Sequence, residues 1–184
     1  MDGDRVGFVN TTTPLQTAAV VYQPDVHDRQ ALANFAHELA TRGYRIGGVV
    51  QEAFFDEQGC RDRIDSVDLA SGERVTINQS SRTRPDGSGC TLDTAALADS
   101  GAPLRRALNE EPDLVIVEKF GEQEQAGAGL MDEIFAVMAA GIPTLVLVPE
   151  VGVESWRTLT GEATPELPCA ADALNQWWQQ RNTD

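Results

Sequence analysis

The sequence predicts an α/β protein, a three-layer α/β/α sandwich around a mostly parallel sheet. An apolar run at 18–22, a segment with helical spacing and a second apolar run at 44–51 form a strand–helix–strand unit. Such a unit implies a right-handed crossover between parallel strands. Two more buried-strand runs, at 113–118 and 143–148, flank a helical segment at 130–140. The alternation of strand and helix therefore indicates one layered domain.

The first half of that pattern has clear boundaries. Residues 1–17 are polar and without a period, so we expect a loose N-terminal arm followed by a single domain over residues 18–184. Asp28 is placed to cap the first helix and Gly43 to end it. The apolar positions of that helix recur at a spacing of three and four residues: Leu32, Phe35, Ala36 and Leu39.

The middle of the chain departs from this rhythm. Residues 61–69 and 74–78 alternate apolar and polar side chains around a turn, which predicts a β-hairpin inserted into the α/β frame. A helix is expected to begin at 90–93, with Thr91 or Asp93 as its cap. Pro103 should split that helical region.

The C-terminal part is expected to contain less regular structure. Residues 149–168 read as mostly loop, with a short ordered segment around Trp156, and residues 170–180 as a final helix. The pair Trp177 and Trp178 predicts one core anchor and one exposed or interfacial ring.

Composition excludes several classes of partner. The chain has 184 residues, enough for one domain with a full core, and a formal net charge of −15. So acidic a chain argues against nucleic acid and anionic membranes as partners, since both require basic patches. The three cysteines lack the spacing of a disulfide framework or zinc site, and no signal peptide or membrane-spanning run is present, so we expect a cytoplasmic protein.

The stretch 113–129 (DLVIVEKFGEQEQAGAG) is the first candidate for function. In an open parallel sheet, ligands bind outside the carboxyl ends of the strands. An apolar strand that ends in Glu118 has the form of a Walker B element, whose carboxylate holds Mg²⁺ or orients water. Many structural strands also end in a carboxylate, so this signal alone is weak.

The segment after the first strand tests whether the chain has a nucleotide-binding phosphate loop. A phosphate-binding P-loop needs glycines and a lysine, but Gln23–Asp28 (QPDVHD) has neither and carries Asp25 and Asp28. It is not a working Walker A sequence. His27 with these aspartates could bind a metal, although a capped helix start with an exposed histidine is the simpler interpretation.

A better anion candidate lies before the helix expected at 90–93. A helix N-terminus offers free N–H groups, and Arg82 and Arg84 lie just upstream. The alternative is ordinary capping. Cys90 could be a nucleophile, but neither histidine is placed by the sequence to activate it. A role as a small packing residue is therefore favoured. The candidate binding residues here are Ser88, Gly89, Cys90, Thr91 and Asp93.

Lys119 is the only lysine in the chain. It could meet a bound anion together with Gly121 and Glu124, or form a structural ion pair with Glu118, Glu124 or Asp25. The glycine spacing of 121–129 indicates a loop that bends sharply or lets a ligand come close.

Several motifs together resemble an uncharacterised bacterial family often found beside molybdate ABC-transporter genes. They are VVQ (49–51), LASGERVTINQ (69–79), GCTLD (89–93) and EKFGEQEQAGAG (118–129). The resemblance covers roughly residues 17–168 and implies a P-loop-NTPase-like sandwich in which the Asp113 strand lies next to the first strand. The phosphate loop is degenerate here, so nucleotide hydrolysis does not carry over. In that family the position of Glu118 is usually Asn, so a shared role of that side chain is not implied.

Three hypotheses follow. The first is a non-hydrolytic binding or regulatory protein of molybdenum metabolism that holds an oxyanion or a phosphate-bearing ligand near Ser88–Asp93 and Lys119. The second is a nucleoside triphosphatase with an atypical phosphate loop, in which Glu118 acts with Mg²⁺. The third is a protein–protein interaction module, either with a partner or with a second copy, that uses 121–129 and the Trp177–Trp178 helix. Molybdate or a phosphate-bearing molecule is the expected small ligand.

Overall fold

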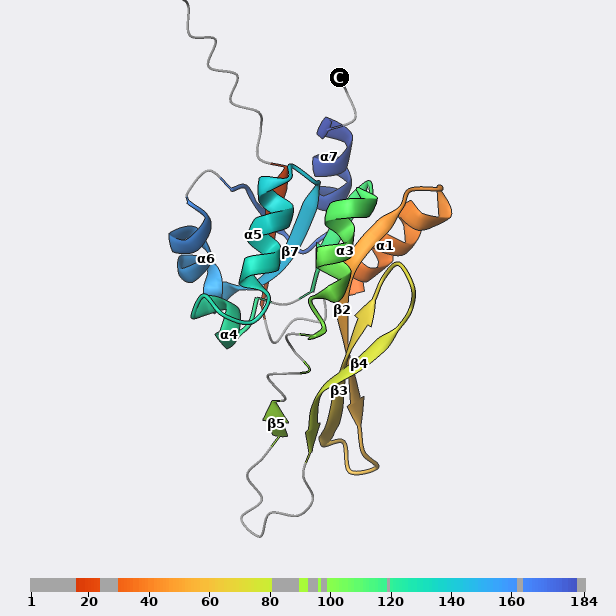
Figure 1. Ribbon diagram of the computed structural model, residues 1–184, viewed down its shortest axis with the longest axis vertical. Coiled ribbons are helices and arrows are strands. Elements are labelled where there is room, and N and C mark those ends of the chain that lie inside the picture. The colour runs from red at the N-terminus through yellow and green to blue at the C-terminus, as the bar shows by residue number, and fades with distance from the viewer. Residues whose placement is uncertain are drawn as a thin grey trace, which may run out of the picture.

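The computed structural model describes residues 16–23, 30–80, 90–92, 96, 99–118, 120–161 and 164–181. Within these residues eight strands form one sheet, in the order β5-β4-β3-β2-β6-β7-β1-β8 (Figure 1). The strands are β1 (Thr17–Tyr22), β2 (Ile46–Phe55), β3 (Arg61–Asp68), β4 (Arg74–Ser80), β5 (Cys90–Leu92), β6 (Leu114–Val117), β7 (Thr144–Pro149) and β8 (Glu166–Pro168).

The helices lie on both faces of this sheet. They are α1 (Gln30–Thr41), α3 (Ala102–Glu110), the single-turn α4 (Glu122–Gln125), α5 (Met131–Ala139), α6 (Val153–Thr160), which follows the short 3-10 turn η2 (Glu150–Gly152), and α7 (Ala171–Arg181). None of the described helices is long and apolar enough to cross a membrane.

Five of the strands are parallel and form the centre of the molecule. β2, β6, β7, β1 and β8 pair in that order, all parallel. Every residue of β6 and β7 is buried, because helices cover both faces of the sheet there. The continuous apolar runs at 113–118 and 143–148 thus predicted these two central strands correctly.

Two cores fill the spaces between the layers. On one face, α1 and α7 pack against the side chains of Ala18 and Val20 and their neighbours in β6 and β7. On the other face, α3, α5 and α6 pack against Ala19 and the alternate residues of the same strands. The three-layer α/β/α sandwich is confirmed, and so is the first helix, whose four predicted apolar positions are all buried.

The strand order corrects one expectation. The Asp113 strand, β6, does not lie next to β1, because β7 stands between them and pairs with both. β7 lies between β6 and β1, and its run Thr144–Pro149 is buried throughout. A central position on the sheet provides that burial.

The inserted hairpin is larger than predicted. β2 continues past the parallel sheet to Phe55 and pairs antiparallel with β3, β3 with β4, and β4 with β5. We call the segment made of β2 from Val50 onward with β3, β4 and β5 the antiparallel arm. It extends away from the helices beyond the carboxyl edge of the sheet (Figure 1). Gly48, just before this departure, has φ +107°, and a Cβ there would lie 2.0 Å from the carbonyl oxygen of Ile116.

The C-terminal part is more regular than predicted. Residues 149–168 contain α6 and β8 rather than mostly loop. Trp156 is fully buried and meets the ring of Phe120 edge to face, with centroids 5.4 Å apart. Trp177 and Trp178 are both buried, so the expected exposed ring is wrong. The aliphatic core between α7 and α1 accommodates both rings, and Arg181 covers Trp177.

Candidate functional site

The chain leaves two neighbouring strands in opposite directions at the carboxyl edge of the sheet. From β1 it goes to α1, which lies on one face, and from β7 to α6, which lies on the other. The carboxyl ends of these strands, Tyr22 and Pro149, are paired. Such a divergence opens a crevice, and ligands of open α/β sheets bind there.

A cavity of about 510 Å³ lies at this place. Its volume is in the range of pockets that hold small organic ligands, roughly 300–1,000 Å³. The walls come from the ends of β1 and β8, the start of η2 and the turn before α7: Val21, Tyr22, Gln23, Glu150, Glu166, Leu167, Pro168, Cys169 and Ala170.

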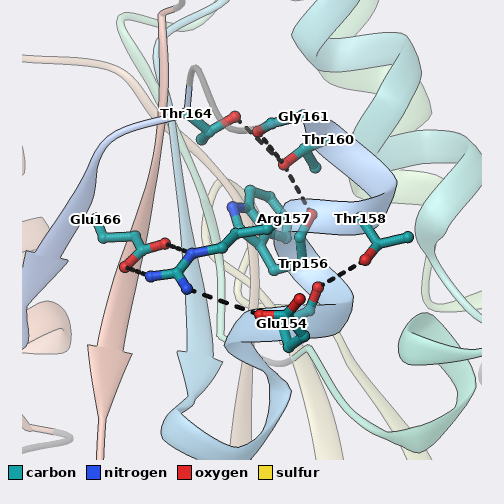
Figure 2. A network of polar contacts seen from close by, with 8 residues as sticks. All are labelled: Glu154, Trp156, Arg157, Thr158, Thr160, Gly161, Thr164 and Glu166. Carbon is teal, nitrogen blue, oxygen red and sulfur yellow. Dashed lines mark hydrogen bonds and ion pairs between the residues drawn. The ribbon is translucent and has the colours of Figure 1, made fainter.

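A polar network fixes the wall that β8 contributes (Figure 2). Arg157 of α6 donates from Nε and Nη2 to the two carboxylate oxygens of Glu166, at 2.6 and 2.9 Å. Its other terminal nitrogen lies 3.8 Å from Glu154. The hydroxyl of Thr164 donates to that of Thr160, which donates to the carbonyl of Trp156. A bidentate ion pair thereby fastens this three-residue strand to α6.

Glu118, at the carboxyl end of β6, is turned toward β2. Its Oε2 accepts a hydrogen bond from the backbone N–H of Gln51 at 3.0 Å, and its own N–H donates to Val49 O at 2.9 Å. Regular β2–β6 pairing ends at Val49 and Val117. The carboxylate therefore extends the β2–β6 pairing by one more hydrogen bond at the base of the antiparallel arm.

The loop after β6 is held by Glu124. This side chain is buried and accepts hydrogen bonds from the N–H of Gly121 at 2.8 Å and of Leu130 at 3.2 Å. Gly129 has φ +60°, and a Cβ there would lie 2.2 Å from Glu124 Oε1. The glycine spacing that indicated a sharp bend is thus explained by a carboxylate enclosed by the loop's own backbone.

A second hollow, of about 380 Å³, lies at the opposite end of β2 between α3 and the β3–β4 turn. The two guanidinium groups at its rim are engaged. Arg45 donates to the carbonyls of Glu110 and Glu111, and Arg106 binds the carboxylate of Asp68. These contacts fasten α3 to the sheet, which favours a structural role for this hollow.

Burial of the Asp68 carboxyl favours its neutral form, but hydrogen bonds outweigh that effect. Donors are the Ser71 hydroxyl, the Ala70 N–H and the Arg106 guanidinium, and together they hold the pKa of Asp68 below its usual value of 3.8.

Among the described residues, no three His, Cys, Asp or Glu side chains gather in a way that could hold a metal ion.

Comparison with known proteins identifies the family of this chain. The sequence profile of a family described as "Protein of unknown function (DUF2478)" matches residues 17–177. The chain belongs to this family. It is also 38% identical over 173 residues to "Molybdenum import ATP-binding protein ModC 2" of Bradyrhizobium diazoefficiens. That match takes in 92% of this chain and 19% of the relative, so the chain spans about a fifth of the relative's length.

Two solved structures share the fold of this DUF2478 chain. A human cancer-related nucleoside triphosphatase, solved in solution, has a TM-score of 0.64 and 16% identity, over 91% of this chain and 95% of that one. THEP1 from Aquifex aeolicus has a TM-score of 0.58 and 14% identity, over 90% and 96%. At such low identity the likeness concerns the fold alone, and it confirms the P-loop-NTPase-like layout.

The DUF2478 fold brings together only part of the predicted site. Gln23 is exposed and lines the cavity, whereas Glu118 faces β2 and Glu124 is enclosed by its loop. Predictions for the remaining residues fall outside the described part of the chain: Asp25, His27, Asp28, Ser88, Gly89, Asp93 and Lys119.

The anion site expected at a helix N-terminus needs a correction. Cys90–Leu92 is the strand β5, in which Cys90 pairs with Ser80 and Thr91 with Gln79 of β4. The N–H groups of an edge strand alternate between its one partner and the open side, so they do not converge on an anion as those of a helix start do. Three residues with one apolar side chain carry too little pattern to distinguish a strand from a helix start. The pairing with β4 determines that the segment is a strand.

Sequence reasoning missed most walls of the cavity. Tyr22, Glu150 and Cys169 lie at the ends of elements whose polar and apolar residues show no periodic signal, and β8 is only three residues long. The Pro165–Pro168 spacing around Glu166 was the one available indication of an edge strand, because proline is tolerated at sheet edges.

Proposed function

We propose that this protein is a non-hydrolytic ligand-binding or regulatory protein linked to molybdenum metabolism, acting in the cytoplasm. Its ligand binds at the carboxyl edge of the sheet, where β1 and β7 part. The link to molybdenum rests on the relative named for molybdenum import, and the location rests on the cavity at the divergence of the two strands. The ligand is an oxyanion or a phosphate-bearing molecule.

The observation that carries the non-hydrolytic part is the contact between Glu118 and Gln51. In a nucleoside triphosphatase an acid at the end of this kind of strand holds Mg²⁺ or orients water near the phosphates. Here that carboxylate binds a backbone N–H of β2, and the segment after β1 has neither glycine nor lysine. Both features favour holding a ligand over cleaving one. Lys119 remains a proposed anion contact, whereas Ser88–Asp93 does not, because β5 lies at the opposite end of the sheet from β1 and β7.

A paired assay tests this proposal. Thermal shifts are measured with molybdate, tungstate, sulfate, phosphate, ADP and ATP, with and without Mg²⁺, at one ionic strength, because a ligand of the native state raises its apparent stability. Phosphate release from ATP and GTP is measured in parallel. We expect a shift with at least one of these ligands and no turnover above a mock purification.

Turnover that disappears in Glu118→Gln would overturn the non-hydrolytic assignment. The matched control is Glu122→Gln, which changes an exposed acid of the adjacent loop. Absence of any shift would remove the ligand-binding proposal as a whole.

The alternative function is a nucleoside triphosphatase with an atypical phosphate loop. It is favoured by the fold, which matches a nucleoside triphosphatase over 91% of the chain. Mg²⁺ would be its cofactor, and Glu118 would have to leave Gln51 to hold it. A protein–protein interaction module, including self-association, has less support, because both tryptophans of α7 are buried and present no aromatic surface.

A further inference from the structure

We infer that the cavity at the ends of β1 and β8 receives an uncharged, planar ring of an organic ligand rather than a bare oxyanion. This inference rests on the proposed function and selects between its two ligand classes. It follows from the chemistry of the cavity walls, which differs from what a tetrahedral anion requires.

The charges of the described walls disfavour an anion. Both charged side chains there are acidic, Glu150 and Glu166. Glu166 is neutralised by Arg157, whose Nε and Nη2 are both engaged with it, while Glu150 is exposed to solvent. A divalent oxyanion entering this space would lose hydration and meet a carboxylate, with no compensating cation among the described wall residues.

The remaining walls suit an apolar ring. Leu167, Pro168 and the buried Cys169 form one side, and the half-buried Tyr22 lines the cavity at the end of β1. Gln23 adds an exposed amide with one acceptor and two donor hydrogens, which fits the polar edge of a heterocycle. A few polar groups set in apolar walls are typical of organic-ligand pockets. A phosphate carried by such a ligand must lie outside these walls.

Binding of uncharged ring compounds tests the inference. The probes are adenosine, guanosine and riboflavin, compared with molybdate, tungstate and sulfate at equal ionic strength, by thermal shift and isothermal titration calorimetry on the full chain. At least one ring probe should bind. The inorganic anions should not compete with it.

Two variants locate the binding. Ala170→Phe enlarges an exposed wall residue and should abolish ring binding, whereas Ala140→Phe, at the exposed end of α5, should leave it unchanged. Gln23→Ala removes only the amide and should weaken binding about three- to tenfold, the worth of one hydrogen bond. This second variant does not depend on how the larger side chain is tolerated.

The outcomes separate the two proposals. Binding of an oxyanion without any ring probe overturns the inference and leaves the proposed function standing. Ring binding that survives both Ala170→Phe and Gln23→Ala overturns the assigned location. Binding of no probe and no anion overturns both.

Discussion

The parallel sheet and the antiparallel arm belong to one continuous sheet, but different forces stabilise them. In the parallel part, two apolar cores enclose β6 and β7 from both sides. In the arm, the separate apolar cluster is the pair Ile64 and Ile77, and polar contacts supply the rest. Arg74 binds Glu52, Arg63 stacks 4.2 Å from the ring centre of Phe54, and Thr76 donates to the buried Asp65.

The difference indicates how the two parts should respond to change. Burial of apolar surface is not subject to electrostatic screening and does not depend on protonation, whereas ion pairs on a surface are weak and screened. The arm should therefore open locally at a lower free energy than the parallel sheet. The proposed ligand cavity lies at the parallel sheet. Substitutions in each region can test this comparison.

The largest effect is expected from Trp156→Ala. The ring is fully buried against Phe120, and its removal leaves a cavity beneath α6. Loss of a buried aromatic side chain costs about 3–5 kcal/mol. Urea denaturation should report that loss, with Val151→Ala, an 80% exposed position, as a control that stays within about 0.5 kcal/mol. A loss below 1 kcal/mol for Trp156→Ala would contradict the packing described here.

The next largest effect is expected at the junction of the two regions, from Gly48→Ala. Its positive φ costs about 1–3 kcal/mol for another residue. The added Cβ would also overlap the carbonyl of Ile116, so β2 and β6 must separate. Gly59 also has a positive φ, +77°, but a Cβ there would meet no atom within 4 Å, so Gly59→Ala reports the cost of the positive φ alone. Equal losses of unfolding free energy in the two variants would show that the close approach to β6 does not matter.

A smaller, pH-dependent effect is expected at Asp68, where α3 meets the arm. Because its folded-state pKa is lowered, its contribution to stability is present above the unfolded value, 3.8, and is lost as the pH falls through the folded pKa. Asp68→Asn should cost about 1.5–3 kcal/mol at neutral pH, the worth of charged hydrogen bonds. It should also flatten the acid limb of the melting temperature between pH 7 and 2.5.

Asp172→Asn provides the control for that experiment, since Asp172 is exposed in the first turn of α7. An unchanged acid limb in Asp68→Asn would mean that other carboxylates dominate acid unfolding. The contacts of Asp68 would then not determine how the arm responds to pH.

The sequence predicted the two regions unequally, for physical reasons. Apolar periodicity located the buried face of α1 and the central strands, because burial on both faces leaves a strong local signal. Strand order and the partner of Glu118 depend on contacts between distant segments, whereas β5 is three residues long, too short to carry a pattern. Gln51 is 67 positions from Glu118, and a side chain bound to a backbone N–H leaves no mark in either stretch. Local patterns thus predicted the scaffold, and long-range pairing determined the candidate site.

The smallest effect is expected from the ion pair between Glu52 and Arg74 on adjacent strands of the arm. Nearly half of each side chain is exposed, at 46% and 48%, so the pair is worth about 0–1 kcal/mol and is screened by salt. Glu52→Gln should therefore lower stability slightly at low ionic strength and not at all in 1 M salt, where the Debye length is about 3 Å.

Hydrogen exchange of the β3 and β4 amides measures this local loss of stability directly. The matched variant is Glu38→Gln, which breaks an exposed ion pair on α1. Faster exchange confined to the arm at low salt, with the parallel strands unchanged, is the result that the comparison requires. Equal acceleration in β6 and β7 would instead mean that the arm and the parallel sheet open as one unit.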